Sequence, residues 1–195
     1  MGVNFMKKTK THSKNNFSKI SKSKGMTFIE VLVALVIIVV GILGAVALQA
    51  TAKKGSFDAM QRSLASSLAQ DIIERMRNND ATALVSYNKV DYGVALDAVP
   101  SKRCNTEGTL CTPDEMVTND QYEFELALMG ADVTNDGNNV GGLVGAVGCI
   151  TTAINVVTVI ITWEGRTEIS DGGAVGKCGI ESNKRRQVMM EAFIY

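Results

Sequence analysis

Residues 24–50 read KGMTFIEVLVALVIIVVGILGAVALQA, and no other stretch of this 195-residue chain constrains its structure so strongly. Across residues 31–48 no side chain is polar. With Phe28 and Ile29 the apolar run reaches about 20 residues, or roughly 30 Å as an α-helix, which matches the hydrocarbon layer of a bilayer. We therefore expect residues 26–50 to form a transmembrane helix.

The residues before this run are basic. Residues 1–25 contain seven lysines and no acidic residue, so this end should stay in the cytoplasm while the C-terminal part crosses the membrane. Because seven of the 20 basic residues lie in this leader, residues 26–195 carry 13 basic and 20 acidic residues. Because that balance repels phosphate, we do not expect nucleic acid as a partner. The triplet Lys184-Arg185-Arg186 is read as a solvated strand edge, with a DNA-contacting patch as the alternative.

Composition also restricts the chemistry. The single histidine, His12, lies in the basic leader, so a chain without its leader has no Ser-His-Asp or Cys-His machinery and no histidine metal ligand. Residues 132–137 (DVTNDG) match a calcium loop poorly, because Leu143 stands where the bidentate glutamate belongs. We expect a turn there and predict a non-enzymatic protein without cofactor or metal. A membrane-anchored periplasmic enzyme that works with carboxylates alone is the alternative from another class.

Glu30 is the one charged side chain inside the apolar run. An unpaired charge at that depth costs about 2–3 kcal/mol or more, so it calls for a positive partner. An α-amino group newly exposed at Met26 would serve, in the same chain or in a neighbouring subunit. A secretory signal cut after Ala45, Ala47 or Ala50, or a plain membrane anchor, would leave the acid unexplained.

The segment Lys24–Leu35 (KGMTFIEVLVAL) resembles the class III signal of type IV prepilins and of type II secretion pseudopilins. The resemblance implies that prepilin peptidase, a membrane aspartyl peptidase, removes the leader 1–25 by cutting between Gly25 and Met26. It further implies N-methylation of Met26 and retention of the apolar helix for assembly, with Glu30 as the fifth mature residue. The first mature residue in that family is most often phenylalanine, and here it is methionine.

After Leu48 the pattern becomes amphipathic, and we assign residues 51–80 to the second half of one continuous helix, which ends near Arg77-Asn78-Asn79-Asp80. Its apolar stripe has helical spacing and comprises Phe57, Met60, Leu64, Leu68, Ile72 and Met76, widened by Ala65, Ala69 and Ile73. We expect the stripe to pack on the domain that follows.

Residues 81–195 are predicted to form a periplasmic globular domain built on a β-sheet. Residues 122–128, 155–163 and 187–195 are strand candidates because apolar residues alternate or β-branched residues dominate. On 155–163, Val157, Val159, Ile161 and Trp163 should share one buried face. The predicted class is α+β, with a long N-terminal helix packed on an antiparallel sheet, which is the type IV pilin fold that the resemblance also implies.

All four cysteines follow the membrane segment, and an even number in an exported domain favours disulfides. Three pairings exist for Cys104, Cys111, Cys149 and Cys178. We favour Cys104–Cys111, because the short loop that contains glycine brings the two together, and Cys149–Cys178, which would tie the central strand to the segment before the last one. A zinc site is the weaker alternative, because six residues separate the first pair rather than two to four.

Two softer segments, LQAT at residues 48–51 and LAQDIIERMRN at residues 68–78, resemble the PilV-like branch of minor pilins. That resemblance implies a minor pilin of the inner membrane that later enters an extracellular type IV pilus and primes its assembly near the tip. The implied partners are prepilin peptidase, other minor and major pilins and the inner-membrane assembly platform, with effects on cell adhesion and twitching motility. A minor pseudopilin of a type II secretion system is the alternative.

Overall fold

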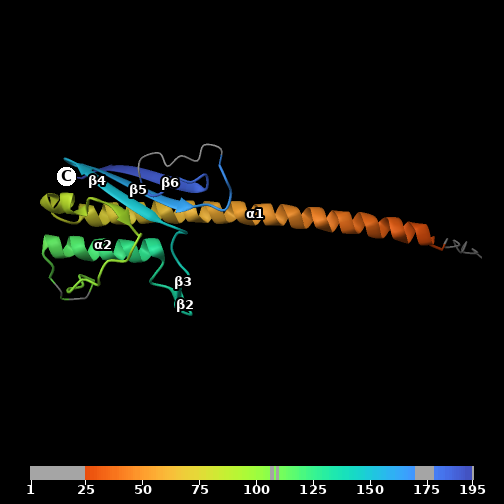
Figure 1. Cartoon of the computed structure of the whole chain (residues 1–195), viewed down its shortest axis with the longest axis horizontal. Helices are drawn as coiled ribbons and strands as arrows, with labels where there is room; N and C mark the ends of the chain where they lie inside the picture. The colour runs from red at the N-terminus through yellow and green to blue at the C-terminus, as the bar shows by residue number, and fades with distance from the viewer. Residues whose placement is uncertain (1–24, 106–107, 109, 170–177, 195) are drawn as a thin grey trace, which may run out of the picture. The chain divides into compact units, whose positions relative to one another are not determined.

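The computed structural model describes residues 25–105, 108, 110–169 and 178–194, so the predicted leader 1–24 lies outside the described residues. The chain divides into two compact units, Met1–Ala45 and Val46–Tyr195. Helix α1 (Phe28–Arg77) runs for 50 residues from the first unit into the second (Figure 1). The prediction of one long N-terminal helix is therefore confirmed; the helix begins two residues after and ends three residues before the predicted range 26–80.

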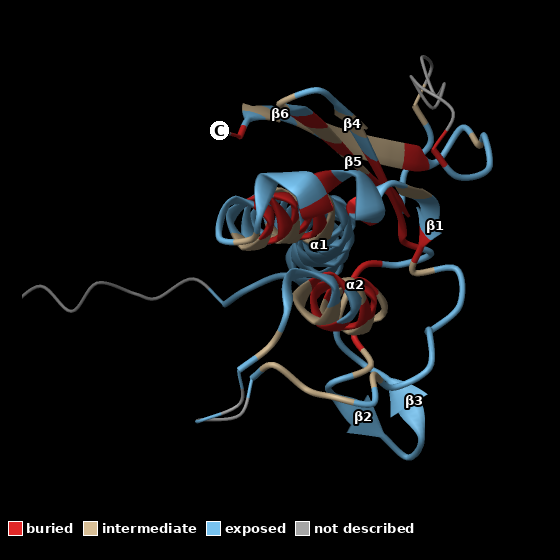
Figure 2. Cartoon of the chain, turned by 90° about the vertical axis from the view of Figure 1, so that its left-hand side faces the viewer, coloured by how far each residue is buried: buried red, intermediate tan, exposed pale blue. Residues whose placement is uncertain are grey.

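The second unit consists of three layers. A sheet of four antiparallel strands, in the order β1-β4-β5-β6, covers one side of α1, and α2 (Pro113–Met129) lies on the other side (Figures 1 and 2). The strands are β1 (Lys89–Tyr92), β4 (Val147–Ala153), β5 (Val156–Glu164) and β6 (Arg185–Phe193). This arrangement confirms the predicted α+β class.

Smaller elements connect these layers. The 3₁₀-helix η1 (Ala81–Tyr87) follows α1 directly and is capped by the side chain of Asp80, which accepts from Thr82 N. Strands β2 (Thr134–Asn135) and β3 (Asn138–Asn139) form a separate two-stranded hairpin. Its turn places Asp136 and Gly137 at φ 50° and 79°, a conformation that favours Asp and Gly. The predicted turn at residues 132–137 is thus part of a hairpin.

The core lies where β5 meets the second half of α1, and Figure 2 shows buried residues gathered between the layers. Val157, Val159, Ile161 and Trp163 all point inward and are buried, as predicted. They face residues of α1 that are equally buried, namely Ala65, Ala69, Ile72, Ile73 and Met76. The two alanines have small side chains, which leave room for the sheet to approach the helix closely.

The buried stripe of α1 is rotated slightly from the predicted one. Met60 is 57% exposed, whereas the neighbouring Gln61 is buried. The Gln61 amide donates to the carbonyl oxygen of Gly142 at 3.4 Å and accepts from the backbone N–H of Val144 at 3.1 Å. A polar side chain whose hydrogen bonds are satisfied can occupy a buried position, and apolar spacing alone does not reveal it.

The strand predicted at residues 122–128 is wrong, because these residues belong to α2. The helix begins with a capping box in which Thr112 and Glu115 exchange hydrogen bonds, and Pro113 occupies its first turn. Phe124 and Leu128 are buried one turn apart, as helical spacing requires. The apparent alternation arose because the half-buried Glu123 and the buried Glu125 interrupt the apolar residues of this segment.

Strands β1 and β4 had no counterpart among the predicted strands. Strand β1 has only four residues, too short for alternation to stand out. Strand β4 pairs along its full length with β5, for example Cys149 with Ile160 and Ile150 with Val159. Its first four residues are buried, which hides any alternation between two faces.

Candidate assembly site

The start of α1 is closed by a capping box. The backbone N–H and the hydroxyl of Thr27 both donate to Oε2 of Glu30 at 3.0 Å, and the N–H of Glu30 donates to the Thr27 hydroxyl at 3.4 Å. The pattern Thr-x-x-Glu was visible in the sequence and is a known start signal for helices. This start signal was not among the predictions above, which treated Glu30 only as a charge in an apolar run.

The peptide bond between Gly25 and Met26 lies just before this cap. Both residues are exposed, and Met26 is 77% exposed. A Cβ atom built on Gly25 would meet nothing within 4 Å. The packing of the described residues therefore does not require glycine at this position.

The apolar first part of α1 is uncovered. Every residue from Phe28 to Ala50 is exposed. Of the helices in the described part of the chain, α1 alone is long and apolar enough to cross a membrane, with a mean hydropathy of 3.2 over its most apolar 18 residues. An apolar surface of this extent calls for lipid or for other apolar helices to cover it.

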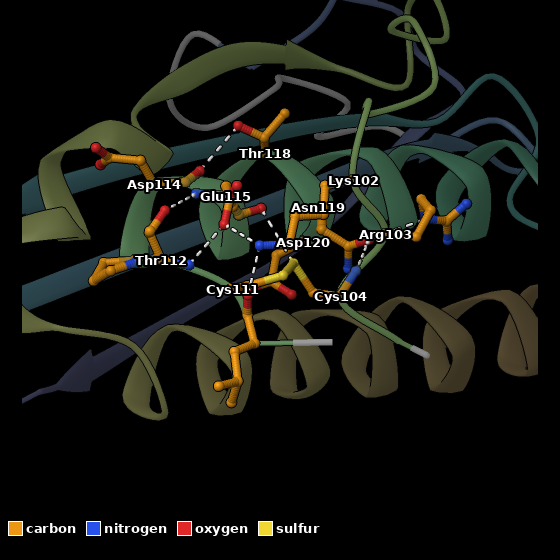
Figure 3. The surroundings of a disulfide bond; sticks show 12 residues. Lys102, Arg103, Cys104, Cys111, Thr112, Asp114, Glu115, Thr118, Asn119 and Asp120 are labelled. Atoms are coloured by element: carbon orange, nitrogen blue, oxygen red, sulfur yellow. Dashed lines mark hydrogen bonds and ion pairs between the residues drawn. A yellow bond between two sulfur atoms is a disulfide. The ribbon is translucent and has the colours of Figure 1, made fainter. Parts of the chain in front are cut away.

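The structure contains both disulfides that the sequence favoured, Cys104–Cys111 and Cys149–Cys178. The first closes a short loop beside α2, where Cys104 N donates to the Asn119 side chain and Lys102 forms an ion pair with Glu115 (Figure 3). The second joins β4 to the residues before β6, and both of its sulfur-bearing residues are buried. These bonds leave no free cysteine among the described residues.

A charged cluster ties α2 to the end of α1. Arg75 forms ion pairs with Asp71 at 2.8 Å, with Glu123 at 2.7 Å and with Asp120 at 3.3 Å. Arg103 bonds the second oxygen of Glu123 at 2.9 Å. The hydrogen bonds from Arg103 and Arg75 lower the pKa of Glu123 although its partial burial opposes them, whereas burial raises the pKa of Asp120.

Asp120 and Glu123 also line a surface hollow of about 300 Å³. Two carboxylates side by side in a hollow are what a periplasmic enzyme without histidine would need. Both carboxylates are already bonded, since Arg75 reaches each of them and the Tyr87 hydroxyl donates to Asp120 at 2.7 Å. The cluster therefore has the contacts of a structural joint between helices.

The basic triplet before the last strand is partly used inside the domain. Arg185 is buried and donates to the carbonyl oxygen of Gly145 and to the hydroxyl of Thr162. Arg186 donates to the carbonyl oxygen and the hydroxyl of Thr167. Lys184 is the one exposed member of the triplet, so the triplet does not form a continuous basic surface.

Comparison with known families gave two adjoining matches. Residues 20–46 match the prokaryotic N-terminal methylation motif, and residues 47–122 match the family of type IV pilin Tt1218. No curated protein and no solved structure matched the chain. Each match covers less than half of the chain, so together with the observed fold they show a similarity to type IV pilins and to proteins with the N-terminal methylation motif.

The apolar helix and the matched motif together favour membrane anchoring of the chain.

Proposed function

We propose that the chain is a minor type IV pilin of the PilV kind, which primes assembly of the pilus near its tip. Prepilin peptidase cuts between Gly25 and Met26 and methylates Met26. The subunit is then anchored in the inner membrane with its C-terminal domain in the periplasm. The assembly platform incorporates it into the fibre with other minor and major pilins. The PilV-like segments at residues 48–51 and 68–78 support this choice.

The observation that carries the proposal is the exposed apolar helix with one carboxylate near its start. Lipid covers its apolar side chains before assembly and neighbouring helices cover them in the fibre. The second Glu30 oxygen, Oε1, accepts no hydrogen bond within the described residues, because Thr27 donates only to Oε2. Glu30 can therefore keep its helix cap and still pair with the amino group of Met26 on an adjacent subunit.

Gly25 supports the same proposal. The described fold leaves space for a side chain at Gly25, so packing does not explain the glycine. A peptidase that needs unhindered access to the Gly25–Met26 bond does explain it.

The test is made on the mature protein and on two variants. N-terminal sequencing should begin at Met26, and a start after Ala45, Ala47 or Ala50 would reject the pilin. Glu30→Leu should be processed normally and fail to enter fibres. Thr27→Val is the matched control, because it weakens the cap and leaves the carboxylate in place. If Thr27→Val blocked assembly as fully as Glu30→Leu, capping rather than pairing would explain the role of Glu30.

Deletion of the gene separates this proposal from a secretion pseudopilin. If the chain is a pilus subunit, its deletion should remove the surface fibres, and with them adhesion and twitching motility, while secretion continues. Loss of secretion with intact fibres would instead assign the chain to a type II secretion system.

A further inference from the structure

A second hollow, of about 290 Å³, lies between α1 and the ends of β5 and β6. It is lined by Asp58, Ala59, Arg62, Trp163 and Arg186. Trp163 is only 2% exposed. The Arg75 cluster described above shares no residue with this hollow, which we call the Trp163 hollow.

Two residues that line the Trp163 hollow each have one side-chain nitrogen without an acceptor. Trp163 Nε1 and Arg186 Nη1 are both buried, and neither finds a hydrogen-bond partner within the described part of the chain. A buried N–H group without an acceptor is costly, and native proteins seldom leave one. Indole and guanidinium groups donate only, so the missing component must be an acceptor.

The charges around these donors favour a negative acceptor. Arg62 is exposed and takes part in no ion pair among the residues that the structure describes. The one acid of the hollow, Asp58, is already bonded by the backbone N–H of Arg166 at 3.1 Å and by the hydroxyl of Thr167 at 3.0 Å. Arg186 also lies 3.7 Å from its carboxylate. The hollow is thus lined by two arginines and one acid, and the carboxylate of that acid already accepts hydrogen bonds from Arg166 and Thr167.

We propose that the Trp163 hollow binds a carboxylate group. The carboxylate oxygens accept from Trp163 Nε1 and Arg186 Nη1, and Arg62 closes over the ligand from the solvent side. Guanidinium groups pair well with the flat carboxylate. Because no ion pair holds Arg62, its side chain can turn aside to admit the ligand. Residues 26–195 carry 20 acidic against 13 basic residues, so a second copy of the chain is itself a source of carboxylates.

The experiment uses the full-length protein in detergent and follows the fluorescence of Trp163, which is the only tryptophan. Glutarate is the probe, with chloride at equal ionic strength and inorganic phosphate as comparisons. We expect a saturable change with glutarate alone. Arg62→Gln should weaken glutarate binding about tenfold, the loss of one charge-assisted contact. Lys54→Gln removes a positive charge from the same helix outside the hollow and should bind like the wild type.

The source of the natural carboxylate is tested by raising the protein concentration without glutarate. A fluorescence change that follows protein concentration and is reversed by glutarate assigns the ligand to a neighbouring subunit, and a response to glutarate alone assigns it to a small molecule. Three results would overturn the proposal: no saturable response beyond that of chloride, equal binding of phosphate, or equal effects of Arg62→Gln and Lys54→Gln.

Discussion

The two disulfides should differ in how strongly they stabilise the C-terminal domain. Cys149–Cys178 spans 29 residues of sequence and Cys104–Cys111 spans seven. A cross-link stabilises by restricting the unfolded chain, and the loop-closure relation gives about 3.6 kcal/mol for the long loop and about 2.4 kcal/mol for the short one. The double variant Cys149→Ala/Cys178→Ala should therefore lose about 1.2 kcal/mol more than Cys104→Ala/Cys111→Ala.

Burial adds to this difference, because Cys149 and Cys178 are both buried whereas Cys104 and Cys111 are half-buried. The assay is urea unfolding of the detergent-solubilised protein, followed by the fluorescence of Trp163, which lies in the core of the domain that the disulfides constrain. Helix content is a poor signal here, since α1 extends beyond that domain. An equal or larger loss of stability for the Cys104/Cys111 variant would refute the reasoning from loop length.

Three further predictions use the same unfolding assay. Gly130→Ala should destabilise the domain severely, because Gly130 has φ +65° and a Cβ there would lie 1.9 Å from the carbonyl carbon of Gly141; stability within 1 kcal/mol (about one core methylene) of wild type would contradict this. The backbone N–H of Thr112 lowers the pKa of Glu115 below its ordinary 4.5, so the ionised carboxylate stabilises above that pH and its contribution fades as the pH falls. Unfolding of Glu115→Gln across the acid range should show a deficit at neutral pH that closes in acid, and a deficit independent of pH would argue against the cap. Ile154→Asn should stabilise the β4–β5 hairpin by about 1 kcal/mol, because Ile154 is 94% exposed and holds φ +58°; a loss of stability would mean that the isoleucine makes a contact worth its strain.

The wrong prediction of a strand at residues 122–128 has a physical cause. Glu125 is fully buried in α2 because Lys89 bonds one of its oxygens at 2.7 Å and the backbone N–H of Asp97 donates to the other at 2.8 Å. Neither partner is near it in sequence. A pattern of apolar and polar residues assumes that acids face water, so it assigns the wrong period wherever tertiary contacts bury an acid. The capping box at Thr112 was the local signal that could have corrected it.

The candidate assembly site, in contrast, depends on residues that are close together in the sequence. The processing segment, its exposed bond at Gly25-Met26 and the acid at Glu30 all lie within a few residues of one another. Local sequence was therefore enough to propose the processing bond and the acid as a site, and the exchange of hydrogen bonds with Thr27 was overlooked. The Trp163 hollow could not be predicted, since it combines α1 with two strands more than 100 residues further along the chain.

The amino-acid sequence alone determined the long helix, its apolar and amphipathic halves and the inward face of β5. Each of these depends on side-chain spacing within one element or on the length of one apolar run, and both are local quantities. Only the tertiary structure decided which polar groups are buried, which strands are neighbours and which donors lack an acceptor. Those properties depend on distances between segments remote in sequence, because a buried charge or N–H group is tolerated or costly only according to the atoms that other segments place beside it.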